Sequence, residues 1–409
     1  MVCISLGTVD KTLIVIIVGC IICFLNRILV QIEASKMINE NLIINNILMS
    51  LSRFLTIVPY IILKIRSKRK NKSSDIENPN HEKKLLYNDQ VKEAAKGKWG
   101  YILLSGFIFL LVSISLTASF KINTNAWIWY ILFASLFYYL IFKNKLYRHH
   151  YLSIVSIILL GLVIDLITGY IQKEIVDDTL LLFLKFLKQI FFALYNVIAK
   201  YVMEKKYVSV YEFSFYVGLF NLIVFLIFAI FDYYFLKWIK FMEYFDNFDI
   251  TQLFIILGIV FTQLGINITS LFTAKYNSPC HVFIIFVFGQ IAYYVYFSGE
   301  FKLIIILITI FILVIILFLS LIFNEIIEIN FCKLSYNTKR NIMKRAEDDV
   351  IFKSDNDSLN ESNSKNESRS SNDSDNKGEE IKEINEKDEN LIGPINKQII
   401  EDDNYYFKI

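Results

Sequence analysis

The chain has 409 residues and a formal net charge of +3; 55% of its residues are hydrophobic, with 36 Phe and 24 Tyr against 14 Gly and 4 Pro. Apolar stretches of about 18–25 residues recur, the length that a helix needs to cross a bilayer. A segment in lipid must satisfy its own backbone hydrogen bonds, which favours helices. The composition therefore excludes an ordinary soluble globular protein and predicts an all-α membrane protein that contacts the lipid bilayer.

Ten apolar stretches are expected to span the membrane. In chain order they cover residues 12–32, 43–63, 100–120, 125–142, 151–171, 180–203, 208–232, 250–272, 279–297 and 301–323. The first has no clear small-residue cleavage site, so we expect it to be retained after the short N-terminus 1–11. Its C-x-x-C, Cys20 and Cys23, has no further ligand at a suitable spacing and is interpreted as packing.

Basic residues gather in alternate connections. The charged loop 66–98, the turn 143–150 and the segment 337–345 carry many Lys and Arg, which places them on the cytosolic side. Both termini are then cytosolic, which requires an even number of spans. His149 and His150 lie in one of these basic turns, where we expect them on the surface.

The last part of the chain differs in composition. Residues 346–409 are polar, acidic and poor in aromatic residues, so they are predicted to form a disordered cytosolic tail. A cytosolic partner of this tail is left open.

Two stretches indicate an internal repeat. "GFIFLLVSISLTASF" (106–120) and "GIVFTQLGINITSLF" (258–272) align without a gap, so that Gly106, Phe109 and Thr117 match Gly258, Phe261 and Thr269. These are the third and eighth expected spans. Because an odd number of crossings reverses orientation, residues 12–171 and 180–323 would be two inverted five-helix repeats, a plan used by secondary transporters.

Several stretches are similar to one family of membrane proteins. They are "KLYRHHYLSIVSIILLG" (145–161), "NVIAKYVMEKKYVSVYEFSFYVGLFN" (196–221) and "NSPCHVFIIFVFGQ" (277–290). Over residues 10–330 the chain resembles the drug/metabolite transporter superfamily, the EamA-like fold that includes nucleotide-sugar and triose-phosphate transporters. The resemblance implies alternating-access transport of a small organic solute, such as a nucleotide-sugar, a phosphorylated sugar or another metabolite.

Polar residues inside the expected spans are the candidate substrate-binding residues, because they are costly there unless they face protein or a cavity. Arg53 lies near the middle of the second span and would bind an anionic group or pair with a buried carboxylate. Pro59 follows it as a candidate hinge. Gln263 and Asn267 share one helical face and would line the path or form a helix–helix hydrogen bond.

Further candidates lie in other spans. Asp165 would carry a coupled proton or form an ion pair with Lys188, whereas Lys188 alone would extend to the interface. The remaining candidates, each with packing or interface placement as the alternative, are Asn196, Lys200, Asn221 and Tyr293.

Other functional classes are not favoured. The chain has four His and no G-x-S-x-G, H-E-x-x-H or P-loop motif, so we expect no enzyme, no catalytic metal and no cofactor. We also expect no nucleic-acid binding. A transport-inactive membrane scaffold or regulator that acts through the tail is the alternative function. A homodimer is left open, as is the choice among Golgi, endoplasmic reticulum, vacuole and plasma membrane.

Overall fold

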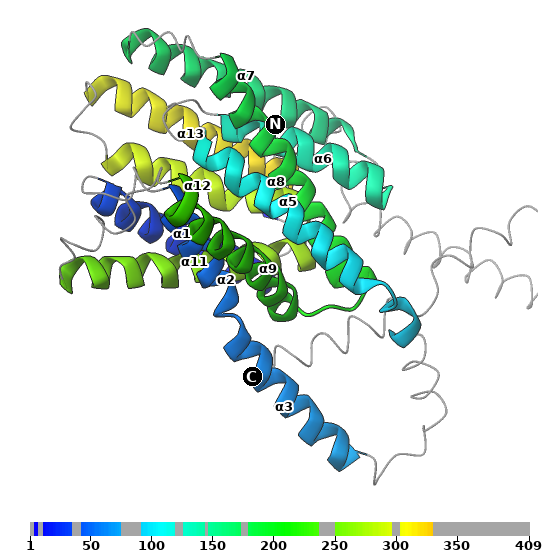
Figure 1. The fold of residues 1–409 in the computed structure, drawn as a ribbon. Helices are drawn as coiled ribbons and strands as arrows, with labels where there is room; N and C mark the ends of the chain where they lie inside the picture. Colours follow the sequence, from blue (N-terminus) through cyan, green and yellow to red (C-terminus); the bar gives the residue numbers. More distant parts are fainter. Residues whose placement is uncertain are drawn as a thin grey trace, which may run out of the picture. The chain divides into compact units, whose positions relative to one another are not determined.

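The computed structural model describes residues 4–6, 11–34, 42–74, 91–118, 126–143, 146–172, 179–236, 250–296 and 303–329. The tail 346–409 and much of the charged loop lie outside the described residues. The described part consists almost entirely of helices (Figure 1). In chain order these are α1 (Lys11–Ala34), α2 (Leu42–Phe54), α3 (Ile57–Ser74), α5 (Lys98–Ala118), α6 (Trp129–Phe142), α7 (Arg148–Gln172), α8 (Thr179–Lys205), α9 (Val210–Phe231), α11 (Ile250–Tyr276), α12 (Val282–Tyr296) and α13 (Leu303–Phe323). Short helical turns precede α6 and α12, namely η2 (Ala126–Ile128) and η4 (Pro279–His281), and η3 (Asp232–Leu236) extends α9.

Seven of the helical segments in the described part are long and apolar enough to cross a membrane. They confirm the expectation of a multi-pass helical membrane protein. Two further apolar helices, Ala126–Phe142 and Pro279–Val295, are shorter. The remaining long helix, α8, carries Lys185, Lys188, Lys200 and Glu204 along its length.

The apolar helices bury one face and expose another apolar face. On α13, Ile312, Leu313 and Ile316 are buried, whereas Leu303 and Phe311 keep 69% and 65% of their surface exposed. A helix that is apolar all round needs a protein partner on one side and lipid on the other. The exposed face of α13 is therefore a lipid-facing surface.

Helices from the first part of the chain pack mainly against helices from the second part. α1 packs against α11 and α12, and α8 packs against α5 and α6. α2 lies along α9, α7 along α13, α5 beside α9 and α2 beside α11. Figure 1 shows α2 next to α9, with α3 continuing from the end of α2.

Two short strands are the only extended pairing within the described residues. β1 (Ile4–Leu6) pairs antiparallel with β2 (Ile327–Ile329), with Ile4 opposite Ile329. β1 precedes α1 and β2 follows α13. The pairing therefore holds the start of the first helix beside the end of the last one.

The core has two main clusters of buried side chains. One joins α6, α7, α12 and α13 and includes the fully buried Tyr130, Phe283 and Leu313. The other joins α5, α8 and α9 and includes Tyr195 and Phe213. The buried Arg53 adjoins the second cluster through its contact with Tyr195.

Candidate functional site

Arg53 lies at a break between two helices. α2 ends at Phe54 and α3 begins at Ile57, with Pro59 in the first turn of α3. The Thr56 N–H donates to the Arg53 carbonyl at 3.1 Å, and the Thr56 hydroxyl donates to the same carbonyl at 2.7 Å. Pro59 is tolerated there because a first-turn residue needs no N–H donor. The break and its local hydrogen bonds therefore fix the position of the Arg53 backbone.

The Arg53 side chain is buried, and no carboxylate of the described residues pairs with it. Only 4% of its surface is exposed. Its guanidinium donates to the Tyr195 hydroxyl of α8 and lies 3.7 Å from the centroid of the Phe109 ring. Its Nε has no hydrogen-bond partner, and no described carboxylate pairs with it. A buried cation held by one hydroxyl and aromatic faces can bind a carboxylate or phosphate, which fits the guanidinium fork.

Helices from both parts of the chain enclose this arginine. Phe109 belongs to α5 and Tyr195 to α8, while Gly218 of α9 lies directly against the Arg53 backbone. A Cβ at Gly218 would lie 2.6 Å from the Arg53 Cβ and 2.6 Å from the Phe54 nitrogen. Only glycine permits this approach of α9 to α2.

Asn267 of α11 joins the same region. Its Nδ2 donates to the Ser52 hydroxyl at 3.1 Å, and Asn267 is 5% exposed. Of the two interpretations considered for this amide, the structure contains the helix–helix hydrogen bond. Gln263, one turn earlier, is half-buried and makes no side-chain hydrogen bond with the described residues. Only one amide of the pair is therefore engaged beside Arg53.

Asn196 and Asn221 are buried and bind backbone carbonyls. Asn221 Nδ2 donates to the carbonyls of Gly106 at 3.2 Å and Val217 at 2.9 Å, which joins α9 to α5. Asn196 Nδ2 donates within α8 to the Phe192 carbonyl at 3.0 Å. Both amides therefore make packing contacts.

The remaining predicted site residues make no contact with Arg53 in the described part of the chain. Asp165 lines a shallow recess with Trp129 and Gly161. Its basic neighbour is Lys185, whereas Lys188 has Arg27 and Lys185 as charged neighbours. Asp165 and Lys188, both of which the structure describes, form no ion pair with each other.

Tyr293 is half-buried. It packs edge-on against Tyr294, with the two ring centroids 5.4 Å apart.

Lys200 is buried rather than extended to the membrane interface. It is 3% exposed, and its Nζ donates to the carbonyls of Lys275 and Asn277, each at 2.9 Å, and pairs with Glu204. The last carbonyls of a helix lack partners within that helix. Lys200 of α8 therefore caps the end of α11, which sequence reasoning missed because the acceptors are distant in the chain.

Replacing Lys200 by Met should lower the free energy of unfolding by about 1–3 kcal/mol, because two carbonyls lose their buried donor. Denaturant titration of the protein in detergent measures this change. Lys206→Met is the matched control, since Lys206 binds a single carbonyl, that of Lys96, in an exposed position. Equal stability of the two variants would contradict the capping role of Lys200.

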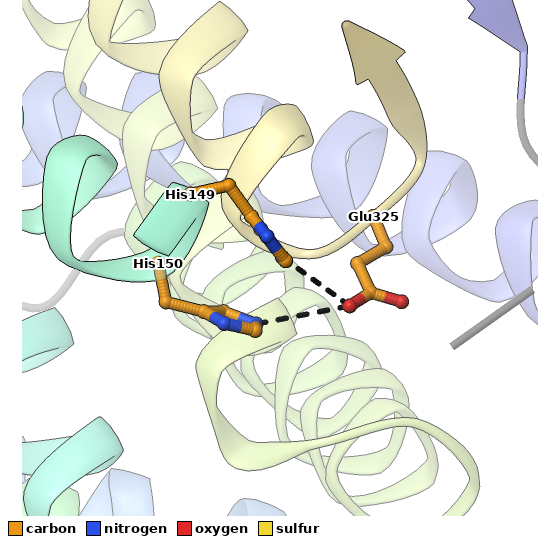
Figure 2. A group of neighbouring side chains, drawn as sticks. All are labelled: His149, His150 and Glu325. Atoms are coloured by element: carbon orange, nitrogen blue, oxygen red, sulfur yellow. Dashed lines mark ion pairs between the residues drawn. The ribbon is translucent and has the colours of Figure 1, made fainter. Parts of the chain in front are cut away.

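His149 is buried and His150 is only partly exposed, contrary to the expectation from the sequence that both lie on the surface. His149 is 3% exposed, and both rings face the carboxylate of Glu325 (Figure 2). The turn is basic, but Glu325, in the segment after α13, lies against both rings. Burial here depends on a segment far along the chain, which a local charge pattern cannot reveal.

Comparison of the chain with known protein families and with curated proteins gives no match. The contacts of Arg53 and its neighbours therefore carry the functional proposal.

Proposed function

We propose that this protein is a secondary transporter that moves a small organic anion across a membrane by alternating access. Arg53 binds the anionic group of the solute. The observation that carries the proposal is a buried guanidinium that no described carboxylate neutralises, at a helix break where helices from both parts of the chain meet. A charge in such a place is costly unless it serves a ligand.

The helix pairing supports ten crossings arranged as two inverted halves. In this arrangement the ten crossings are the seven long spans, the two shorter apolar helices and α8. Helices α1, α2/α3, α5, α6 and α7 then correspond to α8, α9, α11, α12 and α13. The pairing of α1 with α11 and α12 corresponds to that of α8 with α5 and α6, and α2 with α11 corresponds to α9 with α5. In the pairs α2–α9 and α7–α13, each helix packs against the helix that corresponds to it in the other half.

The strand pairing supports an even number of crossings. β1 before α1 and β2 after α13 are hydrogen-bonded to each other, so both ends of the helical part lie on one side of the membrane. Two halves of five helices meet this condition.

The broken helix supports a site near the middle of the membrane. In transporters built from inverted repeats, substrate sites are formed by discontinuous helices at the interface between the halves. The gap between α2 and α3 begins one residue after Arg53, behind Phe54, and α9, the helix that corresponds to α2, packs against Arg53. Movement of one half against the other would then expose Arg53 to each side in turn.

Counterflow in proteoliposomes tests the function. Vesicles containing the purified protein and a high internal concentration of one solute are given the same solute, radiolabelled, outside. We expect accumulation with members of a panel of sugar phosphates, nucleotide-sugars and carboxylates, and none with amines. Accumulation of no solute by a monodisperse protein would contradict transport, and accumulation of amines alone would contradict the role of Arg53.

Deletion of residues 346–409 separates the transporter from the alternative of a membrane scaffold that acts through its tail. The deletion removes none of the helices that contribute to the surroundings of Arg53. Counterflow should therefore be unchanged in the shortened protein. A scaffold would show no counterflow in either form.

A further inference from the structure

Two histidines and one glutamate meet at the start of α7 and the end of α13 (Figure 2). His149 Nε2 lies 3.3 Å from Glu325 Oε1, and His150 Nε2 lies 4.0 Å from the same oxygen. One ligand atom from each residue lies within 4.8 Å of the other two. We call these residues the His149–His150–Glu325 cluster.

Glu325 occupies a backbone position that is unfavourable for it. Its φ of 57° lies in the left-handed region. The Glu325 N–H donates to the Ile322 carbonyl at 3.0 Å, and the Ile326 N–H donates to the Leu321 carbonyl at 2.9 Å. These two bonds form a Schellman helix end, at which this position is usually glycine. A carboxylate at a helix C-terminus also meets the negative end of the helix dipole. A positive group at the carboxylate would offset both effects.

His149 offers unused ligand atoms beside this carboxylate. It is buried, and neither ring nitrogen makes a hydrogen bond with the described residues, because the 3.3 Å contact to Glu325 lacks hydrogen-bond geometry. His149 lies in the first turn of α7. Either ring nitrogen can serve as a ligand, since imidazole is the commonest metal ligand in proteins.

His150 supplies the third ligand after a change of tautomer. Its Nδ1 accepts a hydrogen bond from the Tyr147 N–H at 3.0 Å, so the neutral ring carries its proton on Nε2. Coordination through Nε2 moves this proton to Nδ1 and breaks the bond from Tyr147, with no net release of a proton. Ion binding is thereby coupled to the first turn of α7.

We propose that the His149–His150–Glu325 cluster is a Zn²⁺ site with water in the fourth position. Zn–N and Zn–O bonds of about 2.0–2.2 Å place tetrahedral ligand atoms about 3.4 Å apart. The 3.3 Å separation already fits, whereas the 4.0 Å separation and that between the two histidines, which is within 4.8 Å, contract when the ion binds. Two imidazoles with one carboxylate suit zinc better than magnesium or calcium, which prefer oxygen ligands. The ion would tie α7 to α13, and the site does not depend on the proposed transport.

The full-length protein in detergent, freed of metal with a chelator, tests the site. We expect one Zn²⁺ per chain by calorimetric titration, a rise in Tm on zinc addition, and visible absorption bands of histidine-ligated Co²⁺. His149→Gln and Glu325→Gln should each weaken Zn²⁺ binding at least about tenfold, as loss of groups that support a metal ion does. Glu212→Gln is the matched control, because Glu212 pairs with Lys98 at 2.9 Å and should leave zinc binding unchanged.

Glu325→Gly separates a metal ligand from a structural ion pair. Glycine suits the left-handed position, so the metal-free variant should melt at a higher temperature than the metal-free wild type, and its Tm should no longer respond to zinc. A lower Tm would show that Glu325 serves an ion pair with the histidines and would overturn the proposal. Absence of stoichiometric Zn²⁺ binding by the wild type, or unchanged binding by both glutamine variants, would also overturn it.

Discussion

Arg53→Met is expected to reduce anion transport at least about 100-fold while leaving the protein folded. Two charge-assisted hydrogen bonds to a carboxylate or phosphate contribute about 3–6 kcal/mol, and methionine provides none of them. The stability effect has the opposite sign. Arg53 is buried and no described carboxylate pairs with it, so an apolar side chain of similar length removes a desolvated charge, and the Tm should stay constant or rise.

The two measurements together distinguish a binding residue from a structural one. Counterflow reports the loss of transport, and thermal unfolding in detergent reports the change in Tm. Arg27→Met is the matched control, because Arg27 lies in the apolar helix α1 but is exposed. A large fall in the Tm of Arg53→Met would show instead that the arginine mainly holds Tyr195 and Phe109 in place.

Gly218→Ala should impair both folding and transport. The new Cβ would lie 2.6 Å from the Arg53 Cβ, 2.6 Å from the Phe54 nitrogen and 2.8 Å from the Arg53 carbonyl carbon. Two of these atoms belong to the backbone and cannot move by a rotamer change, so α2 and α9 must separate. Overpacking of this kind costs about 1–3 kcal/mol, and the separation displaces the guanidinium from Tyr195. Gly218→Val should have the larger effect.

Two glycine variants calibrate this result. A Cβ at Gly100 has nothing within 4 Å, so Gly100→Ala should be neutral or slightly stabilising through helix propensity. At Gly106 the nearest atom, at 2.8 Å, belongs to the Phe220 ring, whose side chain can rotate. The Tm of Gly106→Ala should therefore lie between those of Gly218→Ala and Gly100→Ala. Equal Tm values for Gly218→Ala and Gly100→Ala would contradict the close approach of α2 and α9.

The helices, and the position of Arg53 within an apolar segment, could be predicted from the sequence. Long apolar stretches specify helices in lipid because the backbone has no other way to satisfy its hydrogen bonds. Arg53 could be placed inside a span because its distance along the chain from either end is visible in the sequence. The helix break beside it was anticipated only as a hinge at Pro59, whereas α2 ends at Phe54, before the proline.

The environments of the charged and polar residues could not be predicted in the same way. The sequence predicts a surface position for His149 and leaves interface placement of Lys200 as an alternative, yet both residues are 3% exposed. Lys200 is buried because the carbonyls at the end of α11 accept its protons, and His149 because Glu325 folds over α7. Asp165 has Lys185 rather than Lys188 as its basic neighbour, since which charged side chains come near each other depends on the tertiary structure rather than on spacing in the chain.

The sequence by itself determined that this is a multi-pass helical membrane protein and which residues are polar within its apolar segments. These features depend on composition and on the length of a helix in lipid, which are properties of each segment alone. Only the tertiary structure decided that Arg53 meets Tyr195, Phe109 and Gly218, and that His149, His150 and Glu325 come together. Such contacts depend on how helices distant in the chain pack, because each partner comes from a different helix or from the segment that follows one.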